Sequence, residues 1–218
     1  MERIAVQHFS DVLCVWAYVG QVRIDELCRN HGSEIVMHYH FVDVFGDVPG
    51  RITERWRERG GLAAYGKHVL EVAERFEHVQ VHPEIWTRNV PTSSMSCHIF
   101  LHAVFEAGGV QALERAAWAM RESFFVHALD ISTRELQMGL AEELGLSRFE
   151  IEKHLGSGLA AAALSSDLRV AGDQGIKVSP TLTFDEGRQV LRGNVGYRVI
   201  EANMQELLER EGTQHSWC

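Results

Sequence analysis

The chain has 218 residues, of which 45% are hydrophobic and 23% are charged, which is the composition of an ordinary globular protein. Its formal net charge is −9 and no basic cluster stands out, which argues against nucleic acid as a partner. No apolar stretch is long enough to cross a membrane, and residues 1–9 lack the pattern of a signal peptide. We therefore expect a cytoplasmic protein with no membrane partner.

Residues 1–44 predict a strand, a helix and a second strand. Residues 3–9 and 34–44 alternate between apolar and polar side chains, as half-buried strands do. Residues 16–30 carry apolar side chains mostly three or four positions apart, which is typical of an amphipathic helix, and Gly32 suits its end. The three segments form a β-α-β unit.

The middle of the chain is predicted to be helical. Glycines and polar residues divide it into segments that favour helices at residues 53–76, 93–107, 111–125, 132–144, 147–155 and 158–175. We interpret residues 53–170 as an all-helical insertion.

The last part of the chain returns to strands. Residues 176–184 and 189–193 are predicted strands joined by a hairpin turn at 185–188, and residues 195–210 predict a closing helix. The whole order is β-α-β, a helical block and then β-β-α, an α/β arrangement. Residues 1–52 and 171–218 are therefore predicted to form one domain that the insertion interrupts.

Cys14 follows the first strand and stands at the first turn of the first helix. A thiol there lies against the positive end of the helix dipole and beside N–H groups without helical partners. This position predicts a reactive, thiolate-rich cysteine with a low pKa. A dithiol redox site would carry a second cysteine three residues later, but that position holds Ala17.

Three segments together resemble a known family. Residues 10–20, Ser-Asp-Val-Leu-Cys-Val-Trp-Ala-Tyr-Val-Gly, resemble the pattern Ser-Asp-x-x-Cys-Pro-Trp-Cys-Tyr-x-Gly of FrnE-like oxidoreductases. Residues 124–132 resemble the same group's helix that runs into Asp-Ile-Ser, and residues 176–181 resemble its Val-Pro-Thr loop. With the insertion, the chain is similar to the DsbA-like branch of the thioredoxin fold. That branch includes FrnE-like oxidoreductases, 2-hydroxychromene-2-carboxylate isomerases and kappa-class glutathione transferases.

The resemblance implies roles for particular residues. Pro180 should be cis and lie against the Cys14 thiol, and the backbone of Ser179 could pair with a cysteine of a peptide or of glutathione. The predicted catalytic residue is Cys14, and the predicted substrate-binding residues are Trp16, Ala17, Ser179, Pro180 and Thr181. The chain departs from the family pattern at Val15, where proline is usual, at Ala17, and at Ser179, where valine or threonine is common.

The sequence does not decide whether one of the remaining cysteines resolves a mixed disulfide at Cys14. Cys28 lies about four helical turns from Cys14 and is interpreted as a buried, small apolar residue. Cys97 is either structural or a resolving or substrate-facing thiol, and Cys218 could reach Cys14 from the end of the chain. The pairs His38/His40 and His98/His102 each share one face of an element but have no evident third ligand, so no metal site is predicted.

We interpret the chain as a monothiol thiol–disulfide oxidoreductase that acts through Cys14. No tightly bound cofactor is predicted. Glutathione is the expected cosubstrate, because a monothiol cannot release its own mixed disulfide. The substrate would be a protein or small molecule that carries a disulfide. A glutathione-dependent isomerase or transferase, a non-catalytic peptide-binding module and a homodimer remain open alternatives.

Overall fold

The computed structural model describes residues 3–209. A four-stranded sheet with the strand order β2-β1-β3-β4 lies at its centre. β1 (Ile4–Ser10) pairs in parallel with β2 (Ile35–Phe41), while β3 (Thr181–Phe184) pairs antiparallel with both β1 and β4 (Gln189–Arg192). The predicted thioredoxin-like framework with a helical insertion is confirmed.

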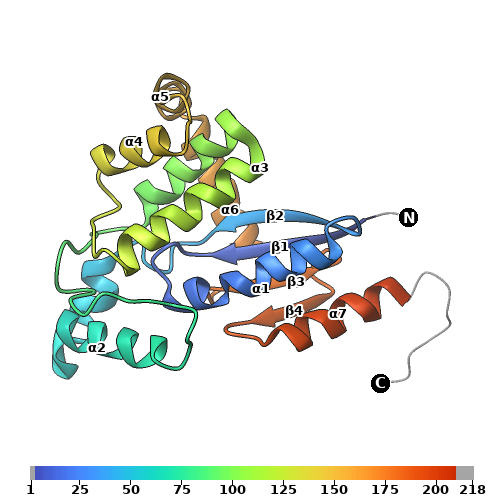
Figure 1. Cartoon of the computed structure of the whole chain (residues 1–218), viewed down its shortest axis with the longest axis horizontal. Helices are drawn as coiled ribbons and strands as arrows, with labels where there is room; N and C mark the ends of the chain where they lie inside the picture. The colour runs from blue at the N-terminus through green and yellow to red at the C-terminus, as the bar shows by residue number, and fades with distance from the viewer. Residues whose placement is uncertain (1–2, 210–218) are drawn as a thin grey trace.

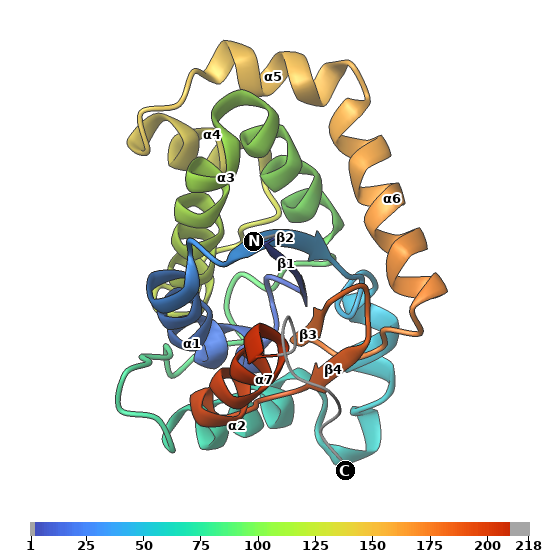
Figure 2. The ribbon, with the colours of Figure 1, turned by 90° about the vertical axis from the view of Figure 1, so that its right-hand side faces the viewer.

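Helices cover both faces of this sheet (Figure 2). α1 (Val15–His31) and α7 (Tyr197–Glu209) bury Ile24 and Met204 against Val6 of β1. On the other face, Phe9 of β1 packs with Ala171 of α6 (Leu159–Asp173). Because side chains of a strand alternate between faces, Val6 and Phe9 serve two separate cores.

The insertion supplies the other helices, which Figure 1 shows beyond the β2 edge of the sheet and at the end where α1 begins. They are η1, a π-helical turn (Pro49–Glu54), η2, a 3-10 turn (Arg57–Arg59), α2 (Gly61–Ala73), α3 (Met95–Phe125), α4 (Arg134–Glu143) and α5 (Arg148–Gly156). α3 is broken at Gly109, whose φ of 74° is left-handed and therefore favours glycine. The break separates two helical halves much as the sequence predicts.

The predicted third strand is too long. Residues 176–184 were expected to be extended throughout, but β3 begins only at Thr181. Residues 176–180 instead form a loop that crosses to the start of α1, where Ser179 contacts Cys14. Pairing with β1 starts beyond this loop, at Thr181 opposite Phe9.

The helices of residues 3–209 are all too short or too polar to cross a membrane.

Candidate functional site

Cys14 lies in a tight turn between β1 and α1, directly before the first helical residue. Its N–H donates to the carbonyl oxygen of Asp11 at 3.1 Å, and its own carbonyl accepts from the N–H of Tyr18 at 3.0 Å. The Asp11 carboxylate accepts from the N–H of Leu13 at 3.0 Å. The hydrogen bond from the Leu13 N–H back to the Asp11 carboxylate is typical of an Asx turn. This turn fixes the position of the Cys14 side chain.

A loop from the far end of the chain covers this turn. The Ser179–Pro180 peptide bond is cis, as predicted. The Cys14 Sγ donates to the carbonyl oxygen of Ser179 at 3.2 Å, and the Ser179 Oγ accepts from the N–H of Asp11 at 2.8 Å. The structure therefore brings Cys14 and Ser179 together across 165 positions of sequence.

Three other predicted binding residues, Ala17, Pro180 and Thr181, are also buried. Ala17, Gly20 and Pro180 line one small pocket of about 20 Å³, so the second turn of α1 faces the proline ring. Thr181 is buried, and its hydroxyl donates to the carbonyl of Val178 at 2.7 Å, which braces the loop.

Trp16 lies just after the Cys14 turn, in α1, and contacts the insertion. Its ring packs edge-on against Phe76 of the insertion, with the ring centres 6.3 Å apart. Its indole thus anchors the insertion beside the Cys14 turn. The role of Trp16 toward a substrate stays a prediction.

The prediction of a low Cys14 pKa is wrong. Only 5% of Cys14 is exposed, and this burial raises the pKa of its thiol above the ordinary value. Hydrogen bonding from the Ser179 side chain and from the N–H groups of Ala17 and Trp16 lowers this pKa by less, and the negative charge of Asp11 raises it further. The helix-start donors are present as predicted, but the loss of solvent outweighs them.

Asp11 is a central residue of the site to which the sequence analysis gave no role. Its buried carboxylate also accepts from the N–H of Phe45 at 2.7 Å and from the Ser94 hydroxyl at 2.8 Å. Burial raises its pKa to about 6, against the lowering effect of these hydrogen bonds. His98 is also buried, and its Nε2 accepts from the N–H of Val12 at 3.2 Å. The signal that could have indicated Asp11 is its spacing from Leu13, which is typical of an Asx turn.

The other cysteines have separate surroundings. Cys97 is fully buried, its Sγ donates to the carbonyl of Ile131 at 3.4 Å, and burial raises its pKa. Cys28 is only partly buried, contrary to expectation, and lines a groove beside β2. Within residues 3–209, all three cysteines are free thiols. Cys218 lies outside the described residues, so its predicted approach to Cys14 stays a prediction.

One histidine from each pair noted in the sequence meets a shared carboxylate. His40 Nδ1 and His102 Nε2 each lie 2.8 Å from an oxygen of Asp167. Across the described part of the chain, no group of three or more histidine, cysteine, aspartate or glutamate side chains could hold a metal ion. These histidines link β2 and α3 to α6.

The chain matches the DSBA-like thioredoxin domain family over residues 5–205. It is a member of that family. Among solved structures, a putative protein disulfide isomerase from Nitrosomonas europaea superposes with a TM-score of 0.77 at 14% identity, covering 97% of this chain and 100% of that one. The cytosolic disulfide reductase DsbM from Pseudomonas aeruginosa with GSH gives 0.71 at 17% identity, covering 94% and 99%. At these identities the likeness concerns the fold.

A curated relative is similar over a shorter stretch. The ClpXP adapter protein SpxH of Bacillus subtilis (strain 168) is 36% identical over 98 residues, 42% of this chain and 32% of that protein. The matched part is thus about a third of the length of SpxH.

Proposed function

We propose that this member of the DSBA-like family is a thiol–disulfide oxidoreductase of monothiol type, with Cys14 as its reacting thiol. One observation carries the proposal. The Cys14 Sγ lies at the start of α1, 3.2 Å from the carbonyl oxygen that precedes a cis proline, while the position one turn along the helix holds Ala17. The site therefore has one sulfur where a dithiol enzyme has two.

The proposed reaction has two exchange steps. The Cys14 thiolate attacks one sulfur of a disulfide, which forms a mixed disulfide with Cys14 and releases the other sulfur as a thiolate. The thiolate of glutathione then attacks the substrate sulfur of that mixed disulfide. This second step forms a glutathione–substrate disulfide and returns the electron pair to Cys14. The alanine at position 17 makes an outside thiol necessary for the second step.

Glutathione suits this role because it is the abundant thiol of a reducing cytoplasm, the compartment that we propose for the chain. The likeness to a disulfide reductase whose structure contains GSH supports this choice at the level of the fold. The backbone of Ser179 would hold the cysteine of glutathione or of a peptide, in place of the present contact with the Cys14 thiol.

The raised pKa of Cys14 has a direct consequence for this chemistry. A thiol that stays protonated at neutral pH reacts slowly, because the thiolate is the nucleophile. Exchange should therefore be slow with small reagents and should speed up as the pH rises. A bound substrate that displaces the Ser179 carbonyl would give the sulfur room to react.

A second candidate is a non-catalytic binding module. The observation that supports it is the burial of Cys14. A buried thiol is compatible with a binding protein, whereas a nucleophile has to be reached by its substrate. The partial match to SpxH, which is named as an adapter for ClpXP, is in keeping with this alternative. In this case the Pro180 loop would bind a peptide without any exchange at sulfur.

Treatment with oxidised glutathione separates the two candidates. The wild type and the variant Cys14→Ser are incubated at pH 7 and pH 9, and peptide mapping by mass spectrometry locates any adduct of glutathione. We expect an adduct at Cys14 that forms faster at pH 9, and Cys28 of α1 serves as an internal comparison. Cys14 without an adduct at either pH, beside an adduct at Cys28, would favour the binding module. Tight binding of glutathione without a disulfide would favour isomerase or transferase chemistry.

A further inference from the structure

The outer edge of β2 has backbone groups without a partner. β2 is a terminal strand of the sheet and pairs only with β1 among the described residues. The N–H of Val42 points toward β1, whereas the N–H of Phe41 points away from it and donates to Asp167. Because these groups alternate along a strand, the N–H and C=O groups of Ile35, Met37 and Tyr39 also face outward.

These outward groups face a groove of about 660 Å³ that is lined by residues of β2 and α3. Its far wall is apolar and includes Phe105, Val110 and Leu113, which flank the break in α3. Phe105 is 42% exposed and Val110 is 40% exposed, so this wall presents neighbouring apolar side chains to the solvent. The volume falls within the range of about 300–1,000 Å³ that is common for ligand sites.

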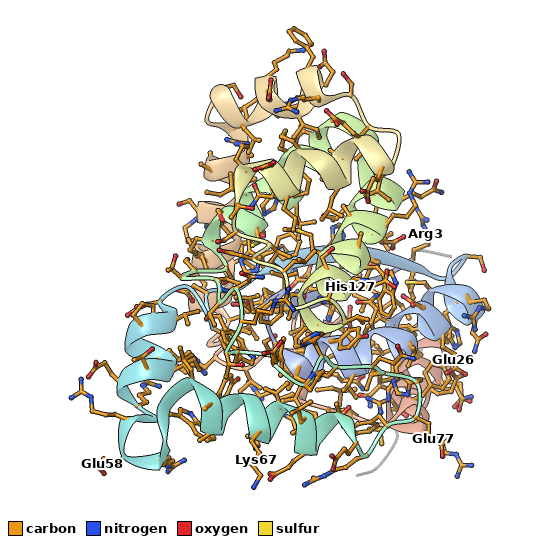
Figure 3. All side chains as sticks on the ribbon, turned by 60° about the vertical axis from the view of Figure 1, so that its left-hand side comes forward. Arg3, Glu26, Glu58, Lys67, Glu77 and His127 are labelled. Carbon is orange, nitrogen blue, oxygen red and sulfur yellow. The ribbon has the colours of Figure 1, made fainter. Side chains whose placement is uncertain are left out.

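The polar side chains of the groove are largely engaged. The Tyr39 hydroxyl donates to Glu114 at 2.6 Å, and His40 and His102 both contact Asp167. Arg3 is exposed, lines the groove and has no ion pair with another described residue. Arg3 precedes Ile4, which pairs with Ile35, so Arg3 lies at the Ile35 end of the groove. Figure 3 shows Arg3 at that end of the sheet, far from Glu58 of η2.

We propose that this groove binds an extended segment of another polypeptide as a fifth strand beside β2. Backbone N–H and C=O groups that repeat along a strand edge are satisfied by another backbone, which a small apolar molecule cannot supply. Every second side chain of the segment would enter the apolar wall of α3. An acidic residue at one end of the segment would pair with Arg3.

This site is separate from the proposed thiol chemistry. No residue that lines the groove belongs to the Cys14 turn or to the Ser179–Pro180 loop. The two proposals can therefore fail independently, and Cys14→Ser should bind the segment as the wild type does.

A phage-displayed library of random octapeptides is the probe. We expect selection on the wild-type protein to enrich sequences with apolar residues at alternate positions and an acidic residue near one end. The best peptide is then synthesised and titrated by calorimetry against Met37→Pro and Met37→Ala. Proline removes one outward N–H and is tolerated on an edge strand, whereas alanine keeps that N–H. We expect Met37→Pro to weaken binding at least tenfold and Met37→Ala to change it less than threefold.

A second arm tests the backbone pairing without changing the protein. The same peptide, N-methylated at every second residue so that the N–H groups facing β2 are lost, should bind the wild type at least tenfold more weakly. Failure to enrich any sequence, or equal binding of the N-methylated peptide, would overturn the proposal. A wild-type dimer that dissociates in Met37→Pro, seen by analytical ultracentrifugation, would also overturn it, since the occupant would then be a second copy of this chain.

Discussion

At the scale of single residues, the Cys14 thiol is subject to two opposing effects. The start of α1 offers N–H groups that favour the thiolate, while burial under the Ser179 loop favours the thiol, and burial has the larger effect. We therefore predict that the rate of Cys14 alkylation by iodoacetamide keeps rising as the pH passes the ordinary pKa of cysteine. Peptide mapping after timed reaction at each pH measures this rate, with Cys14→Ser as the blank.

A plateau of that rate below pH 8 would contradict the prediction, because it would mean that the helix start dominates. The reaction at Cys28 in the same samples serves as a reference for a thiol that is only partly buried.

The Asp11 carboxyl gives a second prediction at this scale. Its pKa in the folded chain is about 6, against an ordinary 3.8, because it is buried. The folded state therefore holds this proton longer than the unfolded state, so its contribution to the free energy of unfolding falls as the pH rises from about 4 to above 6. The difference between these two pKa values corresponds to at most about 3 kcal/mol of the free energy of unfolding.

Urea unfolding of the wild type and Asp11→Asn between pH 4 and pH 8 checks this prediction. The wild type should lose stability relative to the variant as the pH rises, since only the wild type carries the titrating carboxyl. Equal pH profiles for the two proteins would mean that Asp11 does not titrate in this range.

At the scale of elements, the site depends on the contact between the turn before α1 and the loop before β3. Ser179→Ala removes the acceptor for the Asp11 N–H. We expect a loss of about 1 kcal/mol in the free energy of unfolding and faster alkylation of Cys14, because the covering loop is less firmly held. Ser179→Thr keeps the hydroxyl and should resemble the wild type in both measurements. An unchanged alkylation rate of Cys14 in Ser179→Ala would mean that this hydrogen bond of the loop does not protect the thiol.

Local sequence pattern was enough to predict the β-α-β and β-β-α elements and the break near Gly109. The place of Cys14 at the start of the first helix also followed from this pattern, whereas the cis Pro180 and its position against Cys14 followed from the resemblance of short motifs. The pKa of Cys14 could not be predicted, because its burial depends on segments that are distant in sequence, among them Ser179, 165 positions away, and the insertion. Asp11 was missed for a similar reason, since Phe45 and Ser94, which hold its carboxylate, lie in distant segments.

At the scale of the whole molecule, Asp167 joins the insertion to the sheet. It is buried on α6 and accepts hydrogen bonds from His40, His102 and the N–H of Phe41. Burial alone would raise its pKa, but these hydrogen bonds outweigh burial and lower it. The stability it confers is thus present above the ordinary pKa of aspartate and is lost as the pH falls through the lowered value.

We predict that Asp167→Ala lowers the free energy of unfolding at pH 7 by about 2–3 kcal/mol, because it leaves buried donors without a partner. Asp173→Ala is the matched control on the same helix, since its pair with Arg169 is exposed and worth little. Urea unfolding measures both variants. Similar losses for the two would show that Asp167 does not join these elements.

The central claim is that Cys14 turns over as a monothiol with glutathione, and one steady-state assay tests it directly. The protein is given 2-hydroxyethyl disulfide and reduced glutathione. The glutathione–substrate disulfide that it releases reacts with a second glutathione to give oxidised glutathione, which glutathione reductase with NADPH reports. We predict turnover by the wild type that depends on glutathione concentration and rises with pH, and at least a hundredfold loss in Cys14→Ser. Equal rates for the wild type and Cys14→Ser would contradict the account.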